Sequence, residues 1–287
     1  MEFTDSQVRR LKELGVDTPE KVEAAVARLA QTVDVAGLSQ NALFQRIEKQ
    51  AIAATRADIA DLLERRHQPS LLTLEQQISD ALEGAGFTRV VTPTVISAAH
   101  LDKMSVTEDK PLRKQVFWLD DKSCLRPMLA PGLYVVSRKL MQTAPLPLRV
   151  FEIGSCFRRE SEGQRHLSEF TMVDLVEWGT PVEEREQRLA EMMDLVLTAA
   201  GLRSTGTEED VSVVYGEGVD SVDANGLELA SSSMGPHPLD AAWGIDCTWV
   251  GVGFGLERLL QSRQGRTSIH PYARSLTYLD GDTLNIK

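Results

Sequence analysis

The most constraining feature of the sequence is a pair of long strand-like segments that follow one another directly along the chain. Residues 148–159 and 166–178 are rich in β-branched, aromatic and other apolar side chains. Between them lies a short polar loop, residues 160–165. Consecutive strands joined by so short a loop pair as antiparallel neighbours, because a parallel connection needs a crossover of a dozen or more residues. The sequence therefore predicts an antiparallel sheet at the centre of the fold.

Shorter strand-like segments and helical patterns accompany this pair. We expect further strands at 88–92, 115–119, 124–128, 211–215, 227–231 and 249–252. Helices are expected over 133–140, from about 180 to 200 and from about 255 onward. Strands joined by tight loops, with helices on one side of the sheet, are typical of an α+β fold.

Helix signals dominate the first 66 residues. Thr4 and Gln7 fit a capping box, in which each side chain bonds the other residue's backbone N–H. A longer helix with one apolar stripe is predicted from Ser39 to about residue 66. We therefore divide the chain into an N-terminal helical region, residues 1–66, and a larger domain, residues 67–287.

The charge of the chain is unevenly distributed. The net charge is −11, which by itself argues against a nucleic-acid-binding protein. Residues 171–287 carry 8 basic and 19 acidic side chains, whereas residues 1–170 carry 23 of each. Contacts to a phosphate backbone are therefore expected mainly from the first 170 residues.

The sequence contains no membrane, secretion or disulfide signal. No apolar run approaches the roughly 18 residues of a membrane span, and the N-terminus lacks the basic and apolar regions of a signal peptide. Cys124, Cys156 and Cys247 form no CxxC pair, so buried free thiols in a reducing compartment are expected. These features favour a cytoplasmic protein.

Three separated segments of the sequence together point to one function. They are Gly86-Phe87 followed by Pro93, then Phe157-Arg158-Arg159-Glu160 followed by residues 166–170, then the glycine-rich run 253–258. Taken alone, the first segment could be an ordinary helix–strand junction. The third segment, taken alone, could be a tight turn from a strand into a helix. Their order and spacing, however, resemble motifs 1, 2 and 3 of the class II aminoacyl-tRNA synthetases. The resemblance implies activation of an amino acid by ATP and its transfer to tRNA.

The chemistry of activation suits the residues that carry the resemblance. A carboxylate attacks the α-phosphorus of ATP, so negative charge must be neutralised and both reactants held in line. The resemblance implies Arg158, Glu160 and Arg258 as catalytic residues, with the forked guanidinium of Arg158 bridging phosphate and substrate carboxylate. The implied ATP-binding residues are Arg158, Glu160, His166, Phe170, Met172, Glu228, Ser231 and Arg258. Among these, Glu228 and Ser231 are expected to bind Mg²⁺.

A narrower resemblance, to the pyrrolysyl-tRNA synthetase family, covers nearly the whole chain. It is densest over residues 124–134, 151–158, 166–172 and 249–260, and it fits the short type that lacks a separate N-terminal tRNA-binding domain. It implies a large apolar pocket for a lysine extended by an acylated ε-nitrogen, with Tyr215 closing over it as a lid. The implied pocket residues are Ala130, Leu133, Tyr134, Ser137, Asp174, Val176, Tyr215, Trp249 and Gly251.

Two positions depart from the family pattern. The family usually places asparagine at Asp174, where the amide donates a hydrogen bond to the side-chain carbonyl of the substrate. An ionised aspartate has only acceptors, so Asp174 is protonated, points elsewhere, or faces a substrate N–H or cation. The hypothesis is a substrate preference different from plain pyrrolysine.

At Ser137 a bulky apolar residue is expected, so the pocket would be larger or more polar. Ser232-Ser233 is also more polar than usual for the pocket wall.

Several alternatives stay open at this point. The chain could charge tRNA with another bulky amino acid, or be a synthetase-like paralogue with a regulatory or binding role. It could also adenylate a substrate without using tRNA. By resemblance we expect ATP and Mg²⁺, a cognate tRNA of the pyrrolysine type, and a homodimer formed through motif 1.

Overall fold

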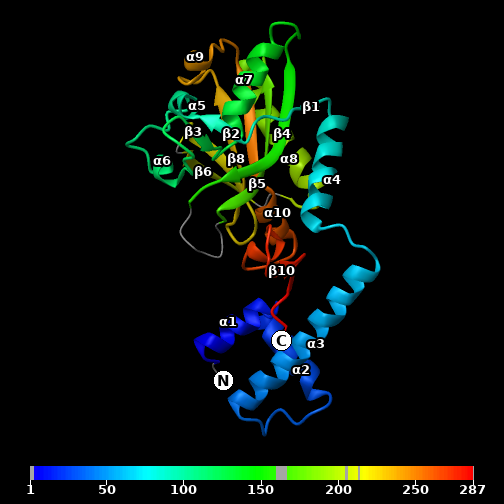
Figure 1. Cartoon of the computed structure of the whole chain (residues 1–287). Coiled ribbons are helices and arrows are strands. Elements are labelled where there is room, and N and C mark those ends of the chain that lie inside the picture. The colour runs from blue at the N-terminus through cyan, green and yellow to red at the C-terminus, as the bar shows by residue number, and fades with distance from the viewer. Residues whose placement is uncertain (1–2, 160–166, 204–205, 213, 287) are drawn as a thin grey trace.

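The computed structural model describes residues 3–159, 167–203, 206–212 and 214–286 (Figure 1). Within these residues the main sheet has seven strands in the order β1-β4-β5-β9-β8-β7-β6. β1 is parallel to β4, and the other neighbouring pairs are antiparallel. The strands are β1 Thr88–Arg89, β4 Leu148–Phe157, β5 Glu169–Trp178, β6 Gly206–Ser212, β7 Gly216–Val222, β8 Glu228–Gly235 and β9 Trp249–Gly255.

The two long strand-like segments form the middle of this sheet, as predicted. β4 and β5 pair along their full lengths, from Leu148 opposite Trp178 to Phe157 opposite Glu169. Residues 160–166, which connect them, lie outside the described part of the chain. The antiparallel sheet and the α+β class are thereby confirmed.

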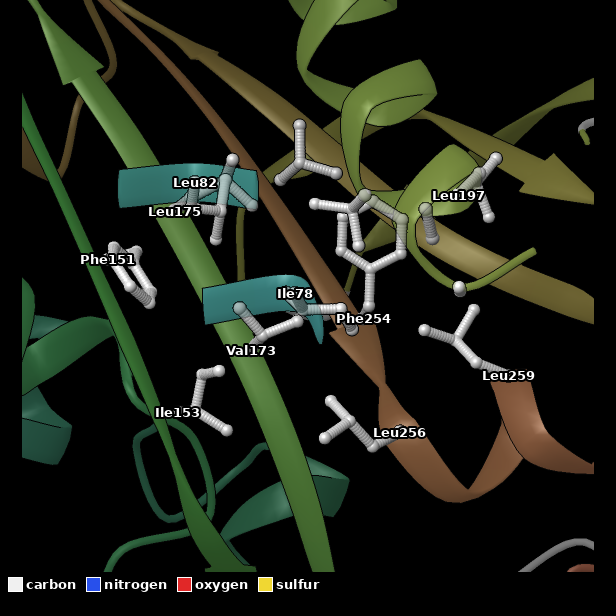
Figure 2. Close-up of a cluster of buried hydrophobic side chains, with 14 of the residues drawn as sticks. Ile78, Leu82, Phe151, Ile153, Val173, Leu175, Leu197, Phe254, Leu256 and Leu259 are labelled. Carbon is white, nitrogen blue, oxygen red and sulfur yellow. The ribbon is translucent and has the colours of Figure 1, made fainter. Parts of the chain in front are cut away.

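The main hydrophobic core lies on one face of the sheet, under helices α4 (Ser70–Gly84), α8 (Arg185–Ala199) and α10 (Leu256–Arg263). Successive side chains of a strand point to opposite faces, so alternate residues of β4, β5 and β9 enter this core. Figure 2 shows them against side chains of the three helices. The labelled residues are Ile78, Leu82, Phe151, Ile153, Val173, Leu175, Leu197, Phe254, Leu256 and Leu259.

The opposite face is also covered, so the prediction of helices on one side only is wrong. A second buried cluster joins Val150, Val176 and Trp178 of the sheet to residues of α7 (Ala130–Leu140). Val150 and its neighbour Phe151 are both fully buried, in different clusters. A strand that is apolar on both faces needs a covering layer on each. The shorter helices of this layer are α5 (Ala98–Lys103), α6 (Pro111–Gln115) and α9 (Asp240–Trp243).

The predicted hairpin around residues 115–128 is only partly present. Proline at the first turn of α6 favours a helix, and the helix ends at Gln115. Trp118 then makes a single bridge to Cys124. The N–H of Leu119 donates to the carbonyl oxygen of Ser123, and the N–H of Leu125 to that of Phe117, both at 2.9 Å. Strand β3 (Ser123–Leu125) also pairs with β2 (Val95–Ser97), which the sequence did not predict.

In the described part of the N-terminal region, residues 3–64 form three helices with a small core of their own. They are α1 (Asp5–Glu13), α2 (Pro19–Ala30) and α3 (Gln40–Glu64). The capping box of Thr4 and Gln7 is present, and Ser39 caps α3. A buried cluster of Leu11, Leu29, Leu43 and Ile47 holds the helices together. None of the described helices is long and apolar enough to cross a membrane.

The C-terminal segment connects this helical region to the sheet domain (Figure 1). The hairpin of β10 (Tyr278–Leu279) and β11 (Asp282–Thr283) contacts α3. Asp280 lies in its turn, at φ +47°, and accepts hydrogen bonds from the backbone N–H and the hydroxyl of Ser70 at 2.8 and 2.9 Å. His67 Nε2 lies 2.5 Å from the same carboxylate. The chain between α3 and α4 is therefore held by its distant C-terminal part.

Candidate active site

A cavity of about 520 Å³ lies on the α7 face of the sheet. Residues of β5, β8, β9 and α7 line it, together with residues that follow β4 and precede β7. The residues proposed from sequence that line it are Ala130, Leu133, Tyr134, Arg158, Phe170, Met172, Asp174, Val176, Tyr215, Glu228, Ser231, Trp249, Gly251 and Arg258. Of the others, Glu160 and His166 lie outside the described residues.

Ser137 is the one described member of that set that does not line the cavity. Its side chain on α7 is fully buried, and its Oγ has no hydrogen-bond partner within the described residues. Ser232 and Ser233 on β8, in contrast, both line the cavity. The additional polarity in the wall therefore comes from β8.

The glycines of β9 form part of the cavity wall. The strand pairs with β5 so that Gly253 is opposite Asp174, Gly251 opposite Val176, and Trp249 opposite Trp178. The intervening residues Val250, Val252 and Phe254 enter the main core. A Cβ atom added to Gly253 would lie 2.9 Å from Asp174 Oδ1, so glycine leaves room for that carboxyl group. The glycine-rich run is thus a strand with an open face, and α10 begins directly after it.

One end of the cavity, the arginine end, contains Arg158, Phe170, Glu228 and Arg258. Arg158 Nε donates to the carbonyl oxygen of Pro127 at 2.9 Å, and its guanidinium lies 5.2 Å from the centre of the Phe170 ring. Arg258 forms an ion pair with Glu228 at 2.9 Å. Both guanidinium groups are thus held at the cavity wall, next to an aromatic face and an acidic side chain.

A buried carboxyl group lies behind the arginine end. Glu257, in the first turn of α10, accepts two hydrogen bonds from the backbone N–H of Thr171, at 2.9 and 3.0 Å. Burial raises the pKa of Glu257, and the N–H of Thr171 opposes that shift. Arg274 donates to the hydroxyl of Thr171 at 2.7 Å. These contacts join the start of β5, the start of α10 and the C-terminal segment.

The other end of the cavity, the aromatic end, contains Tyr134, Trp178, Tyr215 and Trp249. The Tyr134 hydroxyl and Trp249 Nε1 each donate to the buried carboxyl group of Asp240, both at 2.9 Å. The ring of Tyr215 meets the Trp249 ring edge-on, with centroids 5.8 Å apart. Burial raises the pKa of both tyrosine hydroxyls, so both stay neutral. This end is therefore lined by neutral aromatic rings that pack against one another.

Asp174 lies between the two ends, four residues from Phe170 and four from Trp178 along β5. Burial raises the pKa of its carboxyl group to about 7, and the nearby Glu152 adds to the shift. Arg158, Arg126 and the backbone N–H of Leu129 act in the opposite direction. Its Oδ1 is buried and has no hydrogen-bond partner within the described residues. Near neutral pH, small changes in its surroundings therefore decide whether Asp174 is charged.

Comparisons with known proteins agree with this geometry. Residues 57–280 match the family model "tRNA synthetases class II core domain (F)". A crystal structure of pyrrolysyl-tRNA synthetase from Desulfitobacterium hafniense is 48% identical, with a TM-score of 0.87 over 99% of this chain and 98% of that chain. The chain belongs to the pyrrolysyl-tRNA synthetase family of class II aminoacyl-tRNA synthetases. It is therefore a tRNA ligase, as the three motifs predicted.

More distant members of the same class resemble parts of the chain. A phenylalanine–tRNA ligase alpha subunit from Exiguobacterium is 25% identical over 89% of this chain and 83% of its own length. A phenylalanine–tRNA ligase beta subunit from Geobacter metallireducens is 32% identical over 103 residues, which are 34% of this chain. The matched region spans only 12% of that subunit, so the likeness concerns the shared class II core.

Several residues that shape this synthetase site were not proposed from sequence. Arg126 and Glu152 form a buried ion pair of 2.6 Å behind Asp174, and Asp240 and Glu257 are buried acceptors. Trp178 contributes an aromatic face. An acidic residue within an apolar strand, as at Glu152, was a usable signal because buried charges need partners. The hydrogen-bond or ion-pair partner of each buried acidic residue lies in another segment of the chain. The sequence alone could not identify that segment.

Proposed function

We propose that this synthetase activates pyrrolysine, or a related bulky lysine-like amino acid, with ATP and transfers it to the 3′ end of a cognate tRNA of the pyrrolysine type. The observation that carries the proposal is one continuous cavity with two chemically different ends. The arginine end suits a triphosphate, and the aromatic end suits a long apolar side chain. The high identity to two solved pyrrolysyl-tRNA synthetase structures supports the choice of substrate.

In this proposal the arginine end binds ATP. Arg158 bridges the α-phosphate and the amino-acid carboxylate, which holds the two reactants in line and neutralises the charge that develops. Phe170 and Arg258 sandwich the adenine, and Met172 lies beside Phe170 on the adenine side. Arg258 leaves its ion pair with Glu228 and meets the γ-phosphate. Glu160 and His166, outside the described residues, complete the set.

The same end offers oxygen donors for Mg²⁺. Glu228 and Ser231 both line the cavity on β8, and the described residues contain no cluster of three or more metal-binding side chains. This fits Mg²⁺, which takes one or two protein oxygens together with substrate phosphates and water. Glu228 and Ser231 would hold the ion, which would neutralise phosphate charge when bound.

The side chain of the amino acid enters the other half of the cavity. Ala130, Leu133 and Val176 supply apolar walls, and Gly251 leaves space beside Trp249. Tyr215 closes the pocket, and the Tyr134–Asp240 hydrogen bond fixes the wall opposite it. Ser137 acts from behind this wall, by leaving α7 without a bulky side chain at that position.

We further propose that residues 1–66 contact the tRNA and that residues 67–287 form the catalytic domain. The separate core of the N-terminal helices supports an independent role for them. A homodimer is proposed through the segment around β1 and β2, where Val91 and Val95 expose 83% and 50% of their surface. The enzyme would act in the cytoplasm, where translation consumes charged tRNA. Sedimentation at equilibrium tests the dimer.

Two assays test the proposed function. ATP–pyrophosphate exchange across pyrrolysine, acyl-lysines, lysine and aromatic amino acids measures activation, and charging of a pyrrolysine-type tRNA measures transfer. We expect exchange with pyrrolysine or a close relative and charging of that tRNA. Exchange without charging would instead indicate an adenylating enzyme, and exchange with an aromatic amino acid alone would contradict the proposed substrate.

A further inference from the structure

We propose that the pocket selects a lysine-type side chain whose terminal nitrogen is a protonated amine, and that Asp174 accepts a hydrogen bond from this nitrogen. The inference rests on the proposed function, because it names the substrate class of the same pocket. Two classes of bulky lysine derivative are thereby distinguished. Alkylation of the ε-nitrogen leaves an amine, whereas acylation of the same nitrogen gives an amide.

The first observation is the position of the Asp174 carboxyl group. It lines the cavity, and its Oδ1 is buried without a hydrogen-bond partner within the described residues. Opposite it, Gly253 keeps the space free of a side chain. A buried acceptor without a donor costs free energy, and a ligand that supplies an N–H removes that cost.

The second observation is the balance of charges on the cavity wall. The charged lining residues comprise four carboxyl groups, Asp174, Asp220, Glu228 and Glu257, and two guanidinium groups, Arg158 and Arg258. Both arginines lie at the arginine end, beyond the last residues of β4 and β9, and Glu228 and Glu257 lie there with them, which leaves Asp174 and Asp220 as the other acidic lining residues. From Asp174 to the aromatic end, the described lining contains no lysine or arginine. This half of the cavity therefore favours a cation.

The third observation is the aromatic end itself. Aromatic rings attract cations, and the rings of Tyr134, Trp178, Tyr215 and Trp249 line this end of the cavity. The Tyr134 hydroxyl and Trp249 Nε1 both donate to Asp240, which places a carboxyl group behind two of these rings. A bulky alkyl group on a charged nitrogen would lie among these rings while the nitrogen reaches Asp174.

The groups around Asp174 make its charge sensitive to the ligand. On β4, Glu152 and Cys156 face it; Arg126 and Arg158 approach from the loops next to that strand, and Tyr215 faces it from the chain before β7. With a pKa of about 7, Asp174 is half ionised near neutral pH. An amine cation favours the ionised carboxylate, whereas a substrate carbonyl needs the protonated acid as a donor.

The two substrate classes therefore give opposite pH dependence. Binding of an amine cation requires ionised Asp174, so it strengthens as the pH rises through about 7 and is constant above. An amide that binds through its carbonyl oxygen requires protonated Asp174, so its binding weakens over the same interval, and an amide that turns its N–H toward the carboxylate lacks the charge of the amine. The amine itself stays charged throughout, because the pKa of an alkylammonium is about 10.

The test is pyrophosphate exchange with a matched pair of probes. Nε-(cyclopentylmethyl)-lysine and Nε-(cyclopentanecarbonyl)-lysine share one carbon skeleton and differ in CH₂ against C=O, and thus in charge. We expect the amine to have the higher kcat/KM at about pH 8, by about tenfold or more, and the ratio to fall toward about pH 6. Because both probes share the α-amino and carboxyl groups, the ratio removes the pH dependence of the rest of the site.

Two variants complete the test. Asp174→Asn supplies an amide donor, so the preference should reverse in favour of the amide probe and become independent of pH. Asp246→Asn makes the same change at an exposed position outside the cavity and should behave as wild type. The wild-type pH profile stands as a test even if a variant folds poorly.

The possible failures are distinguishable. A wild-type preference for the amide, or an amine-to-amide ratio that rises toward low pH, would overturn this inference and leave the proposed function intact. No exchange with pyrrolysine or with either probe would overturn the proposed function, and the inference with it.

Discussion

At the residue scale, the site depends on an ion pair that does not itself line the cavity. Arg126 Nη1 donates to Glu152 Oε1 at 2.6 Å, and the two side chains are 5% and 0% exposed. Thr92 donates to both oxygens of Glu152, at 3.0 and 2.7 Å. Gly154 permits this arrangement, because a Cβ atom there would lie 2.1 Å from a guanidinium nitrogen of Arg126. The pair fixes the chain around β4 directly behind Asp174.

Glu152→Gln tests the importance of this pair. The substitution leaves the Arg126 charge buried without its counter-ion, so we expect the free energy of unfolding to fall by about 3–5 kcal/mol. Urea denaturation measures this. Asp61→Asn is the control, because the exposed Asp61–Arg65 pair should contribute less than about 1 kcal/mol. Equal effects of the two substitutions would contradict this account of the pair.

Arg158→Lys tests the proposed catalytic guanidinium. Lysine keeps the charge but loses the fork that can hold a phosphate and a carboxylate together. We expect kcat for pyrophosphate exchange to fall on the order of 100-fold, as for loss of one transition-state donor. Arg159→Lys, at the exposed neighbouring position, should be close to wild type. A change confined to the KM for ATP would show that Arg158 only binds the nucleotide.

At the element scale, β9 shows how much the sequence could predict. The sequence predicts a strand over 249–252 and a helix from about 255, with a tight strand-to-helix turn as one explanation of the glycine-rich run. The strand in fact continues to Gly255, because its other face enters the main core and the glycine face borders the cavity. Apolar residues and glycines alternate along this run. That alternation was the sequence signal for a continuous strand.

Other elements differ from the prediction for related reasons. The long strands β4 and β5 were predictable, since both combine length with apolar faces. Strand β7 was not, because its sequence Gly-Glu-Gly-Val-Asp consists mostly of residues that are depleted in strands. It forms by pairing with β6 and β8, a tertiary effect. Likewise the position of Asp174 in the cavity followed from the resemblance, whereas its partners Arg126 and Glu152 required the structure.

Gly251→Ala tests the function of the glycine face. An added Cβ atom would lie 3.4 Å or more from its neighbours, an ordinary contact, so we expect the fold and the stability to be retained. The methyl group would occupy pocket space next to Val176. We therefore expect the KM for the bulkiest lysine derivatives to rise by about tenfold, with less effect on unbranched ones. An equal effect on all substrates would contradict a role in selecting the side chain.

At the scale of the whole molecule, the helical region and the sheet domain are two bodies with separate cores. The small core of α1 to α3 is separate from the sheet domain, and polar contacts of the C-terminal segment connect them. Besides the Asp280 contacts, an Arg56 guanidinium nitrogen donates to the carbonyl oxygen of Ile286 at 2.8 Å. The orientation of the helical region toward the cavity therefore depends on this segment.

Asp280→Ala tests this coupling. It removes the acceptor for Ser70 and the contact with His67, and alanine is unfavourable at φ +47°. We expect pyrophosphate exchange to stay near wild type and tRNA charging to fall by about tenfold or more, because small displacements of a bound reactant are costly. Asp280→Asn keeps one oxygen acceptor and tolerates this φ, so it should lose less. An equal loss in both reactions would show that Asp280 supports the catalytic domain instead.

The contact between His67 and Asp280 spans 213 positions of the chain. A ribosome therefore releases α1 to α3 long before it synthesises the segment that fixes their orientation. Because each body has its own hydrophobic core, the two can fold in turn during translation. A chain terminated before Tyr278 would contain the cores of both bodies but would lack the contacts of Asp280 and Ile286, and it would keep the hydrogen bond from the Thr267 N–H to Asp17.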